Sequence, residues 1–303
     1  MRIAVTGRNG QVVRALLERA PMGATVVTLA RPEVDLLDPA AVSTAIAAVR
    51  PDAVINAAAF TAVDLAETER EQAMRINAAG AGAVAAAATA IGVPVVQLST
   101  DYVFDGGLDR PYREDDAPAP LGVYGASKLA GERAVAAASP EHAILRTSWV
   151  YSPFGTNFVR TMLALAASRD EVAVVRDQHG APTSALDIAD GVFSVVRNLL
   201  TRPEDVALRG VFHMTGGGET NWAGFAAAIF AASAAVGGPS ARVRPIPTSD
   251  YPTPARRPAN SRLDNTRLAA RHGVRLPDWT VSLTPCVARL VAETARSSNG
   301  VST

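Results

Sequence analysis

The chain has 303 residues, 48% of them hydrophobic and 19% charged, and its 29 basic side chains balance 29 acidic ones. This length and composition predict a large globular domain with a smaller lobe and a substantial core. A net charge of zero argues against a surface that binds nucleic acid. The single cysteine, Cys286, excludes an internal disulfide framework and a cysteine-based metal cluster, and it indicates a reducing compartment.

Neither a signal peptide nor a membrane span is expected. Arg2 is followed by only a short apolar run and a turn, and the long stretch 78–91 is built mainly of weakly apolar alanine. We therefore expect a soluble cytoplasmic protein with no nucleic-acid and no membrane partner.

Short apolar runs alternate with helical stretches through the first 150 residues. The expected strands are 3–6, 25–30, 53–56, 93–99 and 142–148. The expected helices are 10–20, 39–50, 64–90 in two pieces, and 124–138. Because the strands are apolar on both faces, they predict an α/β fold with a doubly wound parallel sheet, the Rossmann arrangement. Residues 1–150 are predicted to form this dinucleotide-binding domain.

The alternation loosens after residue 150. Helices are expected at 157–169, 187–200, 221–235 and 281–296, and strands at 171–175 and 211–215. The Pro-rich stretch 245–258 favours an extended loop. Residues 151–296 are predicted to form mainly a smaller C-terminal lobe, with segments that return to the first domain, and 297–303 a disordered tail.

The first candidate site is VTGRNGQVV, residues 5–13. Gly7 and Gly10 permit a tight turn whose backbone N–H groups approach a pyrophosphate at a helix N-terminus. Val13 stands where a full fingerprint has a third glycine that gives the helix packing room, and an ordinary strand–turn–helix is the alternative. At the end of the second strand stands Arg31 rather than a carboxylate. This favours NADPH over NADH, the alternative being a solvated arginine.

Tyr124 and Lys128 provide the second signal. They stand at i and i+4 and share a helix face, so the ammonium is expected to favour the phenolate and lower the tyrosine pKa. Thr100 ends an apolar strand at the edge where open α/β sheets bind ligands, and its hydroxyl can donate to a substrate carbonyl. The alternatives are a surface Tyr–Lys pair and an ordinary turn cap.

Further motifs stand in the order TGRNGQ, DLLD, NAAAFTAVDLAE, STDYVFDG, YGASKLAGE, RTSWVY, PTSALDIA and RRPANSRLD. This ordered set resembles the extended short-chain dehydrogenase/reductases, and within them the dTDP-4-dehydrorhamnose reductases, over nearly the whole chain. The resemblance implies an NAD(P)H-binding Rossmann domain and a nucleotide-sugar-binding lobe. It also implies that Thr100, Tyr124 and Lys128 form a catalytic triad. Val13 departs from the family pattern and should push the first helix slightly off the sheet.

The resemblance and the motifs above give two sets of binding residues. The expected cofactor contacts are Gly7, Asn9, Gly10, Gln11, Val12, Arg31, Asp35, Leu36, Ala57, Ala58, Ala59, Thr61, Leu98, Tyr124 and Lys128. The expected sugar contacts are Thr61, Val63, Thr100, Asp101, Tyr124 and Trp149.

The implied reaction is NAD(P)H-dependent reduction of the 4-keto group of dTDP-4-dehydro-L-rhamnose to dTDP-L-rhamnose. The alternatives are a 4-ketoreductase for another dTDP-deoxysugar and a non-catalytic dinucleotide-binding subunit, although the latter predicts a broken triad. Some members of the family dimerise with the help of a metal ion, so a homodimer and a structural Mg²⁺ stay open; the sequence shows no metal-ligand cluster. Arg256 and Arg257 could reach a nucleotide diphosphate, or they could anchor a loop by ion pairs. Trp222 and Phe225 are predicted to be core residues.

Overall fold

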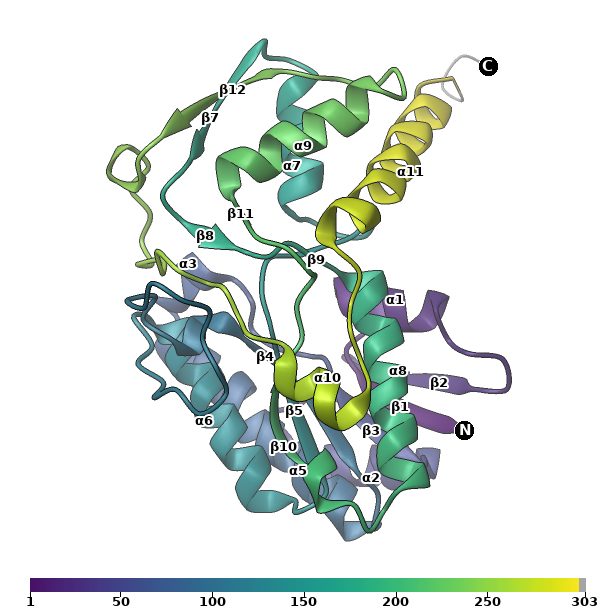
Figure 1. Cartoon of the computed structure of the whole chain (residues 1–303). Coiled ribbons are helices and arrows are strands. Elements are labelled where there is room, and N and C mark those ends of the chain that lie inside the picture. The colour runs from purple at the N-terminus through teal and green to yellow at the C-terminus, as the bar shows by residue number, and fades with distance from the viewer. Residues whose placement is uncertain (300–303) are drawn as a thin grey trace.

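The computed structural model describes residues 1–299, in which a parallel sheet forms one part and a smaller helical region lies beside its carboxyl edge (Figure 1). The sheet has six strands in the order β10-β5-β4-β3-β1-β2, all parallel. Their bounds are β1 Arg2–Thr6, β2 Thr25–Leu29, β3 Ala53–Asn56, β4 Val95–Thr100, β5 His142–Thr147 and β10 Gly210–His213. The doubly wound α/β fold predicted from the sequence is confirmed.

Helices cover both faces of this sheet. On one face α1 (Gln11–Glu18) packs beside α8 (Ala185–Thr201), and their apolar side chains form one core with β1, β3, β4 and β5. On the other face lie α2 (Pro39–Val49), α5 (Ala81–Ala90) and α6 (Val123–Ala138) over a second core. The predicted 64–90 helix is divided into α3 (Val63–Ala66), α4 (Arg70–Met74), the π-helical turn η1 (Arg75–Gly80) and α5.

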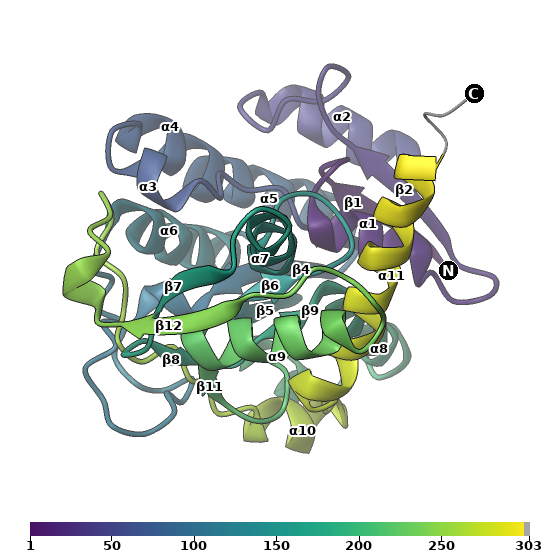
Figure 2. The ribbon, with the colours of Figure 1, turned by 90° about the horizontal axis from the view of Figure 1, so that it is seen from above.

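The smaller region is built around a core of its own. It contains α7 (Phe158–Ala166), β7 (Glu171–Val175), α9 (Trp222–Ala234), β12 (Arg242–Ile246) and α11 (Trp279–Asn299). Strands β7 and β12 pair in parallel, and seen from above they lie beside α9 (Figure 2). Fully buried Tyr151 and Phe225 lie in this core, and the Tyr151 hydroxyl donates to the Trp279 carbonyl.

Short elements connect the two parts. Strand β6 (Val150–Tyr151) pairs with β9 (Thr183–Ser184), and β8 (His179–Gly180) pairs with β11 (Thr220–Asn221). The remaining elements are η2 (Asp101–Val103), η3 (Val206–Leu208), η4 (Thr248–Asp250) and α10 (Thr266–His272). Segments far beyond residue 150 thus return to the sheet, since α8 covers it and β10 forms its edge.

Two expectations near the end of the chain need correction. The stretch 245–258 is not wholly loop, because β12 ends at Ile246 and η4 follows it. Helix α11 continues to Asn299, so residues 297–299 extend a helix rather than a disordered tail. The rest of that predicted tail, 300–303, lies outside the described residues. No helix within residues 1–299 is long and apolar enough to cross a bilayer.

Candidate active site

The turn between β1 and α1 has the geometry of a phosphate cradle. Gly7 has a φ of 98°, which favours glycine, and its N–H donates to the Leu29 carbonyl at 2.7 Å. Gly10 caps α1 without a side-chain acceptor, so no side chain occupies the first N–H groups of the helix. A cofactor pyrophosphate fits this arrangement of backbone donors.

Val13 occupies the position of the missing third glycine. Its side chain is buried in the core under α1, and its Cγ2 would lie 3.2 Å from a Cβ placed on Gly7. The valine therefore fills the space beside Gly7 with apolar packing. Whether it also displaces α1 from the sheet stays a prediction.

A chain of buried hydrogen bonds crosses the carboxyl ends of the central strands. The Thr6 hydroxyl accepts the N–H groups of Ala57 and Ala58 at 3.2 and 3.1 Å and donates to Asn56. The Asn56 amide donates to Gln97, and both Gln97 Nε2 and Lys128 Nζ donate to the Leu98 carbonyl at 2.7 Å. This series of hydrogen bonds runs from β1 to helix α6. It also fixes Ala57 and Ala58 in the segment that was predicted to follow the cofactor.

Thr100, Tyr124 and Lys128 all lie against strand β4. Thr100 is the last residue of this strand, and Tyr124 and Lys128 lie in the first turns of α6, where the Thr100 side chain lies close enough to the Tyr124 hydroxyl to affect its pKa. Thr100 Oγ1 also donates to Asp101 Oδ1 at 3.0 Å and accepts the Tyr102 N–H, so it caps η2 as well. Of the three side chains predicted as a triad, Thr100 and Tyr124 are therefore neighbours at the end of β4, and Lys128 reaches the same strand at the Leu98 carbonyl.

Burial, rather than the neighbouring ammonium, dominates the electrostatics of this group. It raises the pKa of Tyr124 above its ordinary value, with the charge of Asp101 adding to the effect and the bond to Thr100 opposing it. Burial also lowers the pKa of Lys128 to about 8, against the attraction of Glu132. The expectation that Lys128 lowers the Tyr124 pKa is wrong here, because burial of the phenol outweighs the other effects and Lys128 is not among the groups that shift this pKa. The phenol is consequently protonated at neutral pH and can act as a proton donor.

Asp101 presents an unusual carboxylate beside this group. Only 3% of the residue is exposed, and its Oδ2 has no hydrogen-bond partner among the described residues. Burial raises the pKa of Asp101 to about 6, although the side chains of Ser261 and Thr100 lower it in part. An unpartnered buried oxygen at the edge of the sheet suits a ligand hydroxyl, as expected of a sugar contact.

Helix α6 is held in place by side chains that the sequence did not single out. Glu67 Oε1 accepts the Val123 N–H at 2.8 Å, and a Cβ on Gly122 would fall 2.6 Å from that oxygen. At the far end of the motif, Glu132 forms a buried ion pair with Arg146 at 2.6 Å and accepts the Ser99 hydroxyl. Helix α6 is therefore tied to β4 and β5 by buried polar contacts.

Asn77 in η1 is the residue whose contacts the sequence reasoning missed most completely. Its Oδ1 accepts the Phe60 N–H at 2.7 Å, and its Nδ2 donates to the Phe60 carbonyl and to Ser127 Oγ. The Ser127 hydroxyl in turn donates to the carbonyl of Tyr124. One buried amide thus ties the segment containing Ala59 and Thr61 to helix α6. The only signal in the sequence is a polar residue at the start of an alanine-rich run.

The other predicted cofactor residues lie around the turn. Asp35 Oδ1 accepts the Leu37 N–H at 3.0 Å, so this side chain shapes the chain after β2. The Gln11 side chain accepts the Ser152 hydroxyl at 2.8 Å and links α1 to the segment after β6. Asn9 and Arg31 are exposed, Val12 is half-buried, and Leu36 packs beside Gly80.

Arg8, between the two glycines, reaches Glu33 at 2.6 Å. This ion pair lies near the place where Arg31 follows β2. It brings a second guanidinium to the side of the site that was predicted to favour NADPH.

Predicted sugar contacts come from several segments. Val63 begins α3 and Thr61 is exposed just before it, whereas Trp149 lies between β5 and β6 with its indole stacked on Trp222. Trp222 is half-buried, so of the two residues predicted as core only Phe225 is fully buried.

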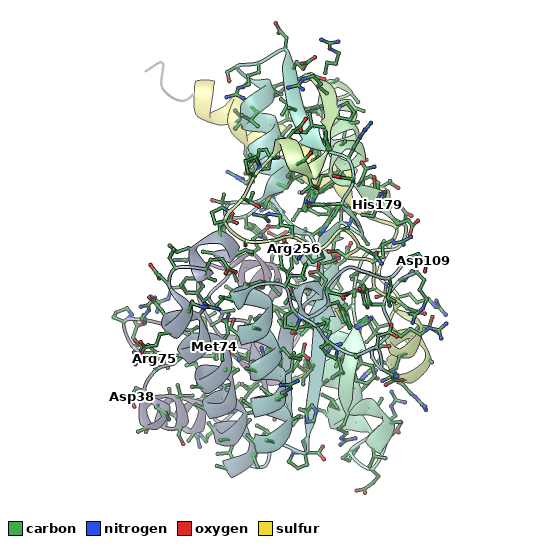
Figure 3. The ribbon with its side chains drawn as sticks, turned by 90° about the vertical axis from the view of Figure 1, so that its left-hand side faces the viewer. Asp38, Met74, Arg75, Asp109, His179 and Arg256 are labelled. Carbon is green, nitrogen blue, oxygen red and sulfur yellow. The ribbon has the colours of Figure 1, made fainter. Side chains whose placement is uncertain are left out.

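Arg257 anchors a loop instead of standing free. It pairs with Asp64 at 2.8 Å and donates to the Tyr102 hydroxyl at 3.2 Å, which supports the ion-pair alternative for this arginine. Arg256 is exposed, at the level where the two parts of the molecule meet (Figure 3).

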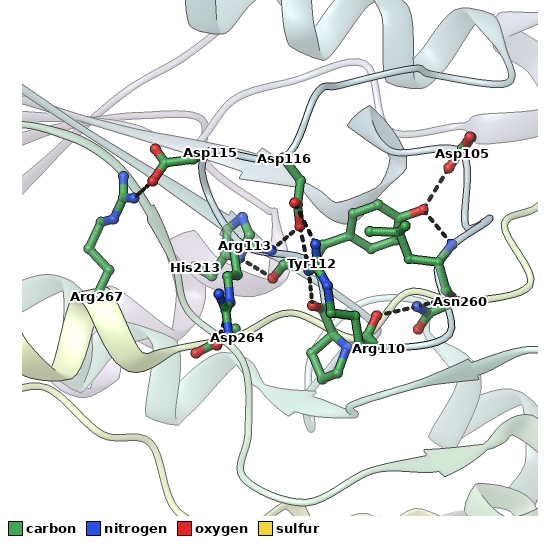
Figure 4. A network of polar contacts seen from close by, with 12 residues as sticks. Asp105, Arg110, Tyr112, Arg113, Asp115, Asp116, His213, Asn260, Asp264 and Arg267 are labelled. Atoms are coloured by element: carbon green, nitrogen blue, oxygen red, sulfur yellow. Dashed lines mark hydrogen bonds and ion pairs between the residues drawn. The ribbon is translucent and has the colours of Figure 1, made fainter.

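The long connection from η2 to α6 is fastened by a polar network (Figure 4). Tyr112 donates to Asp105 at 2.6 Å, Arg110 pairs with Asp116, and Asn260 donates to the carbonyls of Leu108 and Arg110. A pocket of about 620 Å³ opens where this connection meets β10 and α10. Its lining includes paired charges such as Arg267 with Asp115, and none of the predicted site residues.

No group of three or more His, Cys, Asp or Glu side chains within residues 1–299 could hold a metal ion. The prediction of a structural Mg²⁺ therefore has no support from the described part of the chain and stays a prediction.

The comparisons with known proteins agree with one another. The family described as RmlD substrate binding domain matches residues 1–292. The dTDP-4-dehydrorhamnose reductase of Sinorhizobium fredii is 48% identical over 97% of this chain and 99% of its own length. The dTDP-4-dehydrorhamnose reductase of Escherichia coli K12 is 43% identical over 97% of this chain and 100% of its own length.

Solved structures give the same family. A dTDP-4-dehydrorhamnose reductase from Clostridium acetobutylicum has a TM-score of 0.88 at 38% identity, covering 96% of this chain and 99% of that one. The dTDP-4-dehydrorhamnose reductase from Bacillus anthracis, solved in complex with NADP, has a TM-score of 0.88 at 34% identity. The match covers 95% of this chain and 99% of that one.

Proposed function

The chain belongs to the dTDP-4-dehydrorhamnose reductase family, and from this premise we propose that it reduces the 4-keto group of dTDP-4-dehydro-L-rhamnose to give dTDP-L-rhamnose, with NADPH as reductant. The observation that carries the proposal is the placement of Thr100, Tyr124 and Lys128 against strand β4 near its carboxyl end. A non-catalytic subunit would not need this group.

The residues around the β1–α1 turn fit a nicotinamide dinucleotide. Gly7 and Gly10 leave backbone donors for the pyrophosphate, and the segment 57–59 would run along the cofactor. Arg31, with Arg8 nearby, would face the 2′-phosphate that distinguishes NADPH from NADH. When bound, the cofactor supplies the hydride that adds to C4 of the sugar.

Tyr124 would serve as the acid. As C4 is reduced, the carbonyl electron pair moves to the 4-oxygen, which takes the proton from the Tyr124 hydroxyl. The raised pKa of this phenol keeps it protonated beforehand, and an alkoxide is a stronger base than a phenolate, so the transfer is downhill. The hydroxyl of Thr100 orients the same oxygen, and the Lys128 ammonium would bind the cofactor ribose, exchanging its bond to the Leu98 carbonyl.

The sugar would be held between the sheet edge and the smaller region. Asp101 offers a buried carboxylate oxygen to a sugar hydroxyl, while Thr61, Val63 and Trp149 would form the remaining walls. The division into a dinucleotide domain and a nucleotide-sugar lobe, a cytoplasmic location, a homodimer and a structural Mg²⁺ are further parts of the proposal.

The proposal is tested with freshly prepared dTDP-4-dehydrorhamnose and each of NADPH and NADH. We expect oxidation of the nicotinamide coupled to formation of dTDP-L-rhamnose, identified by mass and NMR spectra, with the higher kcat/KM for NADPH. Turnover only with a different dTDP-4-keto sugar would move the assignment to another deoxysugar. Cofactor binding without turnover of any such sugar would indicate a binding subunit and contradict the proposal.

A further inference from the structure

Two indole rings from different parts of the chain lie face to face beside the proposed sugar site. The centroids of Trp149 and Trp222 are 3.7 Å apart and their planes differ by 13°. Trp149 follows the sheet strand β5, whereas Trp222 is the first residue of α9 in the smaller region. The backbone of Trp149 has a φ of 49°, a left-handed conformation that is uncommon for a bulky residue. A strained conformation of this kind persists only where the surroundings fix it.

The ribbon formed by β8 and β11 provides those surroundings. Gly180 in β8 lies against the Trp149 indole so closely that a Cβ there would fall 2.6 Å from Cε2. Gly180 pairs with Thr220 of β11, two residues before Trp222. The same ribbon therefore supplies both the glycine and the indole that contact Trp149.

Trp222 is itself anchored without the help of Trp149. Its Nε1 donates to Gln178 Oε1 at 3.1 Å, and the buried Gln178 side chain donates onward to Thr248 Oγ1 at 3.2 Å. The ring of Phe158 also packs on Trp222, with centroids 4.6 Å apart. Contacts with Gln178 and Phe158 thus hold Trp222, and Trp222 in turn packs against Trp149.

The ribbon reaches the site along its other edge too. The N–H of His179 donates to the Ala259 carbonyl at 2.8 Å, and the Ser261 N–H donates to the His179 carbonyl at 2.7 Å. The Ser261 side chain lies beside Asp101. Two side chains expected to contact the sugar, Trp149 and Asp101, are therefore both next to residues held by β8.

We infer that Trp222 is a positioning residue of the sugar site, which together with Gly180 clamps the two faces of the Trp149 indole, so that the free edge of this half-buried ring stands as a fixed wall for the deoxyhexose. The inference rests on the proposed function and deepens it. A deoxyhexose has apolar C–H groups as well as hydroxyls, and pockets for such ligands combine aromatic walls with a few placed polar groups. Without Trp222 the Trp149 ring would lose its stacking partner and would be held by Gly180 on one face alone.

The experiment compares Trp222→Ala, Trp222→Phe and Trp279→Phe with the wild type. For Trp222→Ala we expect the KM for dTDP-4-dehydrorhamnose to rise about five- to tenfold, the contribution of one aromatic stack. The KM for NADPH should stay within about twofold, because the ribbon does not contact the β1–α1 turn. Trp222→Phe keeps a stacking surface and should restore most of the sugar affinity.

Near-ultraviolet circular dichroism gives an independent readout, since two stacked indoles produce a coupled signal. This signal should disappear in both Trp222 variants and persist in Trp279→Phe. Trp279 is a matched control because it packs edge-on against Phe225 in the core of the same region. That variant should lose stability while keeping the wild-type KM for the sugar. Where Trp222→Ala does not fold, Trp222→Leu serves in its place.

A Trp222→Ala enzyme that has lost the coupled signal but keeps the wild-type KM for the sugar would overturn the inference. An equal rise in the KM of sugar and NADPH would do so as well, because it would indicate general damage. If the wild type does not reduce the sugar, both the proposed function and the inference that rests on it are contradicted. If the wild type is active but Trp222→Ala gives one of the contrary results above, only the inference is contradicted.

Discussion

The carboxyl end of the sheet and the smaller region position their side chains by different means. At the sheet, buried hydrogen bonds run from Thr6 through Gln97 to the carbonyl that binds Lys128, and Asn77 clamps the backbone on two sides. Where the smaller region meets the sheet part, side chains are positioned by stacked rings and partly exposed ion pairs, as with Trp149 on Trp222 and Arg257 on Asp64. Hydrogen bonds restrict the donor–acceptor distance to a range of about 0.5 Å and also restrict the bond angle. Apolar stacking tolerates exchange of one ring for another of similar size.

Under the proposed function, this difference divides the chemistry from the choice of sugar. The groups proposed to handle the proton lie where geometry is specified most tightly, and the proposed walls of the sugar pocket lie where substitution costs less. The predictions below test that division, in order of decreasing expected effect.

The largest effect on stability is expected in its pH dependence at the sheet edge. Folding raises the pKa of Asp101 from 3.8 to about 6. The stability that this carboxyl contributes is therefore fully present below about pH 4 and lost as pH rises through 6. The shift amounts to a change on the order of 3 kcal/mol in the free energy of unfolding.

Asp101→Asn should remove this dependence. Measured by chemical denaturation, the variant should gain stability relative to the wild type between pH 4 and pH 7. The exposed carboxylate variant Asp109→Asn, in the connection to α6, should follow the wild-type curve. If the free energy of unfolding changed with pH in the same way for Asp101→Asn and the wild type, burial would not destabilise the ionised Asp101 carboxylate.

The next effect is expected at Asn77. Asn77→Ala leaves the backbone of Phe60 without its buried partners, which costs about 1–3 kcal/mol of stability. Because the same amide links this segment to α6, which carries the proposed acid Tyr124, kcat/KM should fall about tenfold through lost alignment.

Asn198→Ala is the matched control, since Asn198 also clamps a backbone carbonyl, that of His272, away from the site. It should lose stability without a comparable loss of kcat/KM. Equal kinetic losses in the two variants would contradict a positioning role for Asn77.

The smallest effect is expected at the ion pair between Arg257 and Asp64. Arg257→Met breaks the contacts with Asp64 and Tyr102, and the KM for the sugar should rise about two- to fivefold as the segment carrying Ser261 loosens. Stability should change by less than about 1 kcal/mol, because the pair is partly exposed. Arg256→Met is the neighbouring control and should behave as wild type. A larger effect at Arg256 would instead favour direct binding of the nucleotide diphosphate.

The fold could be predicted because its strands are apolar on both faces and alternate with helices, a pattern that local sequence carries. The pairing of β10 with β5 could not, because Val211 and Ile144 are neighbours only after the intervening chain has folded. The π-helical turn that places Asn77 has no distinct pattern within its alanine-rich surroundings.

Some features of the candidate site could likewise be predicted from the sequence, and others could not. The i, i+4 spacing of Tyr124 and Lys128 correctly placed both residues on one helix, α6, since helical geometry depends on spacing alone. The same spacing gave the wrong direction for the Tyr124 pKa, because it reveals a neighbouring charge but not the degree of burial. The stack of Trp149 on Trp222 joins separate regions, so only the folded chain discloses it.

The central claim is that the Tyr124 hydroxyl supplies the proton to the sugar. Its most direct test is the kcat of Tyr124→Phe for dTDP-4-dehydrorhamnose with NADPH, beside wild type and the exposed variant Tyr251→Phe. We predict that kcat falls about 10²- to 10⁴-fold in Tyr124→Phe, with NADPH still bound, and is unchanged in Tyr251→Phe. A Tyr124→Phe enzyme with the wild-type kcat would contradict the account.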